Sequence, residues 1–458
     1  MWPGANPWPC DRRKLAHSVR SLYKNRSMKG RLLILATGVV VAGITAAKNR
    51  GGSPALSASV AGGRLASEQA PRRATEPRSI AGTFMERDQT TSELALRPDL
   101  KQMQLVGDHY EAPLPGGHVA ILTLEPALQT KAEALLIQAA APRGAIVAMR
   151  TNGAIAALAG QRLEPNGDEP EQFADPNNAV VDYKVATDTW APAASVFKVI
   201  TGTALVKNGV RPDDKVCYHG GVRSVVESNL VDRASDSSCE SLTFGIAHSQ
   251  NAIMAKLAYQ RLQPQDLAQA AAAYGFGQAS ASELPGQVGQ VSLSSEKDVI
   301  FAQNAAGFSG SRLSALGGVQ IANTVATSGL RVTPYIVRAV RDNNGYVTEL
   351  GPRPRIQAIP AATARTVAAM MRQTCEVGSA ARAFRRHPGF PTGLTAAGKT
   401  GTLSSNDPFP MQFSWFVGFA PAEAPEISIS VVLGNSENWR LKGSMVAAEM
   451  IQRALRKR

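Results

Sequence analysis

The pattern of apolar and polar residues predicts strands at both ends of residues 117–458 and helices between them. At the start of this stretch, 118–124 alternates like a half-buried strand, and 125–139 repeats apolar residues at the spacing of an amphipathic helix. The predicted helices that follow are 195–208, 241–260, 265–274 and 314–328. The later predicted strands are 394–403, 413–420 and 426–434, and a last helix covers 443–456.

A β-hairpin is predicted between the first helix and the helical middle. Its strands, 144–149 and 154–160, are separated by a turn that contains Asn152-Gly153, a pair that readily adopts positive φ. Strands from both ends then belong to one sheet, because connections stay short and do not cross. The expected fold class is α/β (α+β): a central antiparallel sheet flanked by helices, with an inserted all-α subdomain and a cleft at their junction.

The residues before 117 divide into four segments of different composition. The first, 1–31, is a basic tail, and the second, 32–47, is an uncharged apolar run of 16 residues. A membrane-spanning helix needs about 20 such residues, with a lower limit of about 17, so flanking residues would complete the span. The segment 48–80, rich in Gly, Ala, Ser, Pro and Arg, is expected to be a flexible linker, and 81–116 a short pedestal.

The net charge of +13 is concentrated near the N-terminus. Residues 1–31 contain eight Lys and Arg residues against one acid, Asp11. A basic chain fits nucleic-acid binding, but cations that directly precede an apolar run are explained by membrane topology, with the N-terminus inside. We therefore expect a membrane and no nucleic acid as partner. The run 32–47 is either an uncleaved transmembrane anchor, which we favour, or a cleaved signal peptide. Both place the rest of the chain outside the cytoplasm.

Three of the four cysteines, Cys217, Cys239 and Cys375, then lie in a compartment that permits disulfides. Two alternatives stay open for the first two of them: a Cys217–Cys239 bridge, or free buried thiols. The sequence contains no CxxC motif and no His/Cys cluster, so we expect no metal and no cofactor.

One serine and one lysine suggest nucleophilic chemistry. Acyl transfer by a serine needs a hydroxyl, a base and donors for the oxyanion. None of the six histidines lies in a GxSxG-like context, so the base must be another residue. Ser195 opens an apolar helix after TWAPAA, and Lys198 lies one turn further on the same face, within reach of the hydroxyl. The N-terminus of a helix also favours developing negative charge.

This spacing alone is not specific. The pairs Ser21/Lys24 and Ser294/Lys297 repeat it, and SxN triplets also recur along the chain. What distinguishes Ser195 is the order of three motifs: its helix start, then Ser249-Gln250-Asn251 after a predicted helix, then Lys399-Thr400-Gly401, which occurs once and lies on a predicted strand.

These motifs, written in full as Ser195-Val196-Phe197-Lys198, Ser249-Gln250-Asn251 and Lys399-Thr400-Gly401-Thr402, resemble the three active-site motifs of penicillin-binding proteins and serine β-lactamases. The stretch from 117 to 456 resembles the transpeptidase domain of the larger penicillin-binding proteins. The resemblance implies the penicillin-binding/β-lactamase-like fold over 117–458, with peptidoglycan stem peptides and β-lactams as ligands. It also implies the bacterial cytoplasmic membrane as the location, with a single pass and a periplasmic catalytic domain.

The resemblance gives Ser195 and Lys198 the central roles. Ser195 attacks the carbonyl of a D-alanyl-D-alanine stem peptide and forms an acyl-enzyme, and Lys198 is the base. To accept a proton, Lys198 must be neutral, so burial and the neighbouring cation Lys399 have to lower its pKa. Ser249 passes the proton to the leaving amine, and Asn251 hydrogen-bonds both Lys198 and the substrate amide.

The third motif is implied to bind substrate. Lys399, Thr400 and Thr402 hold the substrate carboxylate, a charge-assisted contact. Gly401 leaves room for the substrate along the strand edge. The backbone N–H groups of Ser195 and Thr402 form the oxyanion hole. Two further residues near this strand are given no catalytic role here: Trp415 is expected in the core, and Glu376 in a solvated loop.

The expected activity is that of a D,D-transpeptidase that cross-links peptidoglycan. Two alternatives stay open: a D,D-carboxypeptidase, endopeptidase or β-lactamase, and a non-catalytic β-lactam sensor or wall-synthesis scaffold. Residues before 117 leave no room for a glycosyltransferase domain, so a separate glycosyltransferase is a candidate partner. The chain lacks the ExxLN-like segment of class A β-lactamases, and Asn251 argues against class D enzymes.

Overall fold

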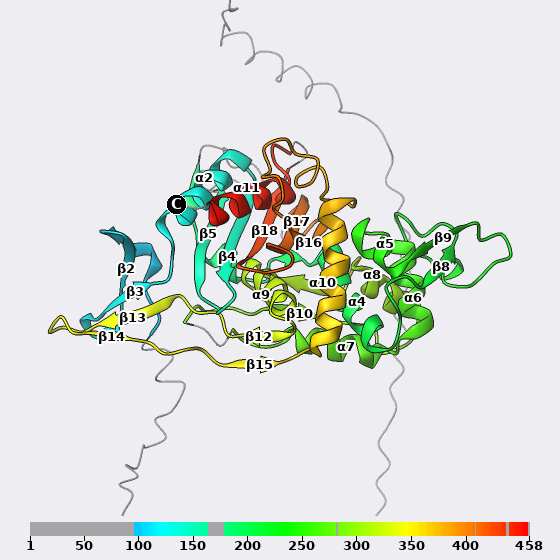
Figure 1. Ribbon diagram of the computed structural model, residues 1–458, viewed down its shortest axis with the longest axis horizontal. Helices are drawn as coiled ribbons and strands as arrows, with labels where there is room; N and C mark the ends of the chain where they lie inside the picture. Colours follow the sequence, from blue (N-terminus) through cyan, green and yellow to red (C-terminus); the bar gives the residue numbers. More distant parts are fainter. Residues whose placement is uncertain (1–95, 164–177, 281–282, 408, 437–438, 457–458) are drawn as a thin grey trace, which may run out of the picture. The chain divides into compact units, whose positions relative to one another are not determined.

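A six-stranded antiparallel sheet organises the part of the chain that the computed structural model describes, namely residues 96–163, 178–280, 283–407, 409–436 and 439–456 (Figure 1). Every neighbouring pair of its strands is antiparallel. In sheet order, the strands are β16 (Ala397–Ser405), β17 (Met411–Ala420), β18 (Ile427–Asn435), β4 (Arg143–Arg150), β5 (Ile155–Leu163) and β6 (Ala179–Val181).

The sheet has buried residues on both faces, because helices cover both. Successive residues of a strand point to opposite faces. On β18, Val431 packs in one cluster with residues of α2 (Pro126–Ala139) and α11 (Gly443–Leu455), and Val432 packs in another with residues of α9 (Ala315–Ala326). Every residue of β18 is buried, including the polar Ser428 and Ser430.

The central sheet confirms the prediction that strands from both ends of residues 117–458 lie together. The first hairpin, β4 and β5, turns through Gly153 at a φ of 94°, and β4 pairs directly with β18 from the C-terminal end. A Cβ at Gly153 would also lie only 2.6 Å from the carbonyl oxygen of Thr333. Both the positive φ and this close contact therefore require glycine at this position.

A helical part lies between β5 and β16 in the sequence, and its helix α10 packs against β16 at the edge of the sheet (Figure 1). Its helices are α3 (Lys184–Thr187), the 3₁₀ turn η4 (Ala194–Phe197), α4 (Lys198–Lys207), α5 (Leu242–Ala247), α6 (Asn251–Arg261), α7 (Pro264–Ala273), α8 (Val299–Ala306) and α10 (Ala361–Glu376). The expectation of an all-α subdomain was wrong, because short strands interrupt the helices. These are β7 (Ala191–Pro192), β10 (Gly289–Val291) and β11 (Ser311–Leu313) in one sheet, and β8 (Lys215–Tyr218) and β9 (Ser238–Ser241) in another.

The single helix predicted over 241–260 is in fact two helices. Between α5 and α6, Ser249 adopts a φ of 59°, which ends regular helix geometry. The apolar pattern did not reveal this break, because apolar residues continue on both sides of it.

A second, five-stranded sheet was not predicted, and the strand predicted over 118–124 belongs to it as β3 and not to the central sheet. The second sheet consists of β1 (Gln104–Val106), β2 (His109–Pro113), β3 (Val119–Leu122), β13 (Val337–Arg341) and β14 (Val347–Glu349), and an ion pair between Arg341 and Glu111 joins two of its strands. Its edge strands β1 and β14 are short and wholly exposed, so they lack the alternation that marks a strand. The domain boundary at 117 stays a prediction, with residues on both sides of it paired in this one sheet.

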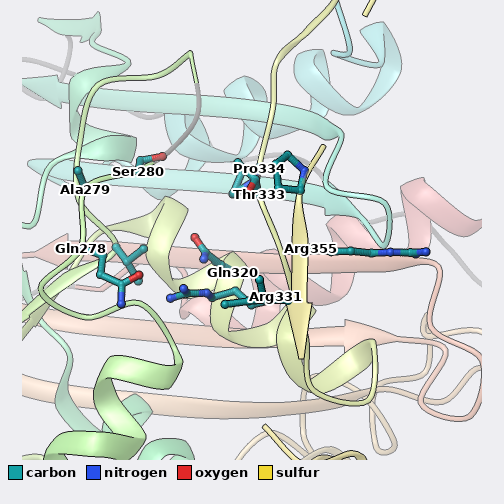
Figure 2. A pocket seen from close by; sticks show the side chains of 11 residues that line it. Gln278, Ala279, Ser280, Gln320, Arg331, Thr333, Pro334 and Arg355 are labelled. Carbon is teal, nitrogen blue, oxygen red and sulfur yellow. The ribbon is translucent and has the colours of Figure 1, made fainter. Parts of the chain in front are cut away.

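Two short strands beside α9 border a pocket that Figure 2 shows from close by. They are β12 (Leu330–Val332) and β15 (Arg355–Gln357), which pair antiparallel. The remaining 3₁₀ turns are η1 (Leu100–Gln102), η2 (Pro115–Gly117) and η5 (Glu227–Asn229).

The predicted tail 1–31, apolar run 32–47 and linker 48–80 lie outside the described residues. Within the described ranges, no helix is both long and apolar enough to cross a membrane.

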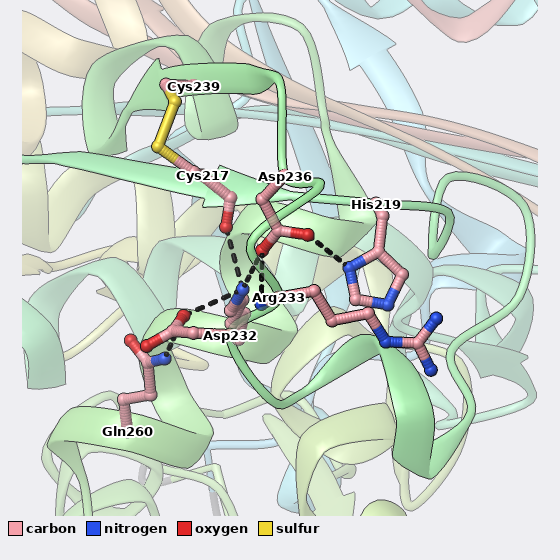
Figure 3. Close-up of a disulfide and its surroundings, with 8 residues drawn as sticks. Cys217, His219, Asp232, Arg233, Asp236, Cys239 and Gln260 are labelled. Carbon is pink, nitrogen blue, oxygen red and sulfur yellow. Dashed lines mark hydrogen bonds and ion pairs between the residues drawn. A yellow bond between two sulfur atoms is a disulfide. The ribbon is translucent and has the colours of Figure 1, made fainter.

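A disulfide joins Cys217 and Cys239, which lie opposite each other on β8 and β9 (Figure 3). This resolves the two alternatives that the sequence left open, and Cys375 is free and buried. The bridge closes a segment, 218–238, which we call the disulfide loop.

Replacing both Cys217 and Cys239 with serine is expected to lower the free energy of unfolding by about 3 kcal/mol, because the unfolded chain regains the entropy that a closed loop of this length removes. Denaturant unfolding would measure the loss. Adding a reductant should cost the unaltered chain the same amount and leave the double variant unchanged. Equal stability with and without the bridge would contradict this account.

Candidate active site

The turn that presents Ser195 is fixed from two sides. In front of it, Trp415 on β17 donates from Nε1 to the carbonyl of Pro192 at 2.9 Å. Ala194 has a φ of 50°, in the left-handed region that a residue with a side chain rarely adopts. Behind it lies Gly307, where an added Cβ would approach the Ala194 carbonyl oxygen to 2.2 Å. Packing on both sides thus maintains a strained backbone at the nucleophile. Trp415 is buried, which confirms its predicted place in the core.

The Lys198 amine lies at the centre of the site. Its Nζ is 2.7 Å from Ser195 Oγ, 2.7 Å from Asn251 Oδ1 and 2.7 Å from the carbonyl oxygen of Ala306. These partners come from η4, from the first residue of α6 and from the last residue of α8. The side chain is fully buried.

The chemistry of these three oxygens differs. The amide oxygen of Asn251 and the carbonyl oxygen of Ala306 can only accept hydrogen bonds, whereas the hydroxyl of Ser195 can donate or accept. A neutral amine has two N–H groups and one lone pair. If the N–H groups go to the two obligate acceptors, the lone pair is left facing the Ser195 hydroxyl.

Lys399 forms the second buried amine of the site. Its Nζ donates to Ser249 Oγ at 2.8 Å and to the backbone carbonyl of Thr400 at 2.9 Å. Among the described residues these two oxygens are its hydrogen-bond acceptors, so a third N–H remains for a ligand. Like Lys198, the side chain is fully buried.

Both lysines have depressed pKa values. Burial, followed by the charge of Lys399, lowers the pKa of Lys198 well below its ordinary value. Burial alone lowers the pKa of Lys399 to about 7. Lys198 is therefore the amine that is neutral near pH 7. A ligand carboxylate beside Lys399 would raise the pKa of Lys399 again and keep it charged.

The strand β16 lies along the edge of the sheet with its third-motif residues in three different environments. Thr400 is half-buried, and its Oγ1 is 2.6 Å from the hydroxyl of Ser379, which follows α10. Thr402 is exposed. The oxyanion hole expected from the N–H groups of Ser195 and Thr402 stays a prediction.

Gly401 is held close to the nucleophile turn. An added Cβ would lie 3.1 Å from Trp415 Cβ, 3.3 Å from Val196 Cγ2 and 3.4 Å from Ala194 Cβ. From the sequence, we expected the space beside Gly401 to be occupied by the substrate. The structure gives a second reason for glycine, because a side chain would press against the residues on either side of Ser195.

The disulfide loop contacts both elements that hold the Lys198 amine. Asn251 donates from Nδ2 to the carbonyl of Val222 at 2.6 Å, which turns its Oδ1 toward Lys198. On α8, Gln303 donates from Nε2 to the carbonyl of Val225 at 2.8 Å, three residues before Ala306. Two backbone carbonyls of one loop thus position the two acceptors of the amine.

A buried lysine of α6 anchors this loop through Asp232 and Asp236, which Figure 3 labels. Lys256 on α6 donates to Asp236 at 2.8 Å, to the carbonyl of Cys217 at 2.8 Å, and pairs with Asp232 at 2.9 Å. His219 lies 2.5 Å from the other oxygen of Asp236. Burial acts against the charge of Lys256, but its hydrogen bonds to the two carboxylates outweigh it and raise its pKa. The same contact, with Lys256 foremost, lowers the pKa of Asp236 to about 2.

The structure therefore brings together all the residues that the sequence singled out: Ser195, Lys198, Ser249, Asn251, Lys399, Thr400, Gly401 and Thr402. It does not do so for the competing pair Ser294 and Lys297. The hydroxyl of Ser294 bonds within its own loop, and Lys297 lies over the ring of Tyr259.

Sequence reasoning missed four contributors to the site. The carbonyls of Ala306 and Val222 leave no trace in a sequence, because every residue has one. Glu376 drew attention in the segment before β16, yet it ends α10 and pairs with Arg372 at 2.6 Å. Ser379, three residues later, is the one that reaches Thr400. The buried Lys256 was also missed, although a lysine at the centre of an apolar helix is a signal worth testing.

Comparisons with known proteins show the family of the chain. Residues 144–456, more than half of the chain, match the model of the penicillin binding protein transpeptidase domain. The chain belongs to this family. Within it, the chain is similar to penicillin-binding protein PbpB of Mycolicibacterium smegmatis, with 26% identity over 253 residues. That match covers 52% of this chain and 38% of PbpB, so the chain spans little more than a third of that relative.

A second relative matches over a larger share of its length. Peptidoglycan D,D-transpeptidase PbpA of M. smegmatis is 23% identical over 351 residues, covering 72% of this chain and 70% of PbpA. Among solved structures, the ceftriaxone acyl-enzyme complex of penicillin-binding protein A from M. tuberculosis superposes with a TM-score of 0.61 at 20% identity, over 75% of this chain and 81% of that one. This likeness supports the penicillin-binding fold.

Within the described residues, no group of three or more His, Cys, Asp and Glu side chains could hold a metal ion.

Replacing Lys399 with methionine is expected to stabilise the folded protein at pH 6, because it removes a buried ammonium. The pKa of Lys399 is about 7 in the folded state against an ordinary 10.5, so the unfolded state binds more protons between these values. The gain of Lys399→Met over the unaltered chain should therefore shrink as pH rises from 7 to 10.5. Denaturant unfolding across this range measures it, with the exposed Lys207→Met as control. A gain independent of pH would contradict the assignment.

Replacing Lys256 with methionine is expected to slow acylation of Ser195 by penicillin roughly ten- to a hundredfold, because small displacements of positioning groups cost rate on this scale. Stopped-flow measurement of the second-order acylation rate constant tests this. The matched control is Asp232→Asn, which removes only the partner that is 81% exposed and should leave the rate constant nearly unchanged. An unaltered rate in a Lys256→Met variant of lowered thermal stability would restrict the lysine to a structural role.

Proposed function

We propose that the chain is a penicillin-binding D,D-transpeptidase that cross-links peptidoglycan stem peptides through an acyl-enzyme on Ser195. The environment of the Lys198 amine carries this proposal. Its pKa is lowered, two obligate acceptors occupy its N–H groups, and its lone pair is left for the Ser195 hydroxyl. This is the arrangement that general-base activation of a serine needs at neutral pH.

Acylation then follows from the contacts. Ser195 Oγ attacks the carbonyl carbon of the penultimate D-alanine as its proton moves to Lys198 Nζ. When the C–N bond breaks, the leaving D-alanine takes the proton of the Ser249 hydroxyl, and the proton that Lys198 gained from Ser195 replaces it, so that Lys198 is neutral again. The Ser249 hydroxyl accepts a hydrogen bond from Lys399 at 2.8 Å and is thereby oriented. Lys399 also offers its remaining N–H to the carboxylate of the substrate, which links substrate binding to the proton path.

Transfer to a second stem peptide completes the reaction. An amine of the acceptor attacks the acyl-enzyme, loses a proton and releases the Ser195 hydroxyl. The name of the relative PbpA, a peptidoglycan D,D-transpeptidase, favours transfer over hydrolysis as the second step. β-Lactams would acylate the same hydroxyl.

We place the catalytic part outside the cytoplasmic membrane, tethered by residues 32–47. The cations that precede this run support an N-inside orientation. The Cys217–Cys239 disulfide fits an oxidising compartment. A separate glycosyltransferase would supply the glycan strands to be cross-linked.

Incubation of the full-length chain with labelled penicillin should add one penicilloyl group to the peptide that contains Ser195, as detected by mass spectrometry. Ser195→Ala should reduce the acylation rate by at least about a thousandfold. Ser294→Ala, which alters the other described serine of the same spacing, should not change it. Stem peptides with an acceptor amine should then give cross-linked dimers. Trimmed monomers alone would favour the carboxypeptidase alternative, and an unmodified Ser195 would refute the acyl-enzyme.

A further inference from the structure

A pocket lies beside α9, apart from the three motifs (Figure 2). Its volume is about 120 Å³. Residues from three chain segments line it together with Gln320 and Val288, and none of them belongs to the proposed active site; the segments are 278–280, 331–334 and 354–356. We call it the Arg331 pocket.

Gln320 points into this pocket from α9 (Figure 2). The residue is only 7% exposed, yet no side-chain hydrogen bond joins its amide to any other described residue. Its amide atoms are not among the fully buried, unpaired polar atoms of the described residues, so they face the space of the pocket, where a ligand can reach them. A ligand in the pocket would supply the missing partner.

Arg331 on β12 adds a charge to the same pocket. It is partly buried, and within the described chain no carboxylate pairs with its guanidinium. Its burial lowers its pKa, which is the effect expected of a cation that lacks a counterion. Glu283, a carboxylate near these segments in the sequence, is already engaged by Arg353 and by the backbone N–H of Ile336.

A nitrogen of Arg331 and a nitrogen of Gln320 both lie beside Gly275. A Cβ placed on Gly275 would lie 2.8 Å from Arg331 Nη1 and 3.6 Å from Gln320 Nε2. Both nitrogens are donors. Gln278, Ser280 and Thr333 add further polar groups to the lining, and the exposed Arg355 on β15 adds a second cation.

We propose that the Arg331 pocket binds an oxyanion, a carboxylate or phosphate group, between the guanidinium of Arg331 and the amide of Gln320. The planar donors of arginine match both groups. A pocket of this volume holds more than one water molecule, so it has room for one such group. The group is either a free small anion or the C-terminal carboxylate of a peptide that reaches in from the surface.

Binding is tested on the full-length chain by following the thermal unfolding temperature during titration. The probes are inorganic phosphate, acetate, and an N-acetylated dipeptide with either a free or an amidated C-terminus, at constant ionic strength set with chloride. A ligand that binds only the folded state raises the unfolding temperature with a saturable dependence on concentration. Saturation by phosphate or acetate identifies a small anion, and saturation by the free-acid dipeptide but not its amide identifies a peptide terminus.

Two variants assign the effect to the pocket. Arg331→Met and Gln320→Leu should each weaken the dissociation constant by at least about tenfold, because each removes a donor to the anion. Arg338→Met is the control, since Arg338 is an exposed arginine of β13 that lies against Glu349 instead of a pocket. Without ligand, Arg331→Met should be at least as stable as the unaltered chain. If the arginine had only a structural role, its removal would lower the stability. Absence of saturable binding by every probe, or equal binding by both variants, would overturn the proposal.

Discussion

The buried Lys198 amine is the constraint on which the rest of the site depends. An amine in a fully buried position is neutral only if its surroundings do not supply a counterion, and here they supply carbonyl-type oxygens and a second amine instead. Every other feature can be understood as a consequence. The strained Ala194 places the hydroxyl within reach of the amine, and Lys399 keeps the charged form of Lys198 unfavourable while it holds Ser249.

This arrangement has a cost in stability, and the helical part shows what offsets it. Two lysines with depressed pKa values make the folded state less favourable near neutral pH. A third buried lysine, Lys256, stays charged instead, because two carboxylates pair with it. It fixes the disulfide loop, whose carbonyls position the acceptors of Lys198. One buried lysine is thus kept charged so that another can stay neutral.

The sequence revealed the parts of the molecule in which side chains determine structure. Apolar runs predicted β4, β5, β17 and β18, because both faces of the sheet are buried and the pattern is strong. The three motifs predicted which side chains meet. The sequence did not predict the backbone groups of the site, because tertiary packing places them. These are the left-handed Ser249 that splits the helix and the carbonyls of Ala306 and Val222. The exposed strands of the second sheet were not predicted for a related reason, because pairing with neighbouring strands stabilises them more than their composition does.

Gly401 shows how closely chemistry and packing are joined at one position. A lysine, a threonine and a glycine on β16 were interpreted as ligands for substrate, and the glycine as empty space for it. In the structure that space borders Val196 and Ala194, so the glycine also allows the strand to lie against the nucleophile turn. An alanine there would have to displace either the strand or the turn, and both carry reacting groups. The glycine of the motif therefore serves the close packing of β16 against the nucleophile turn as well as the substrate.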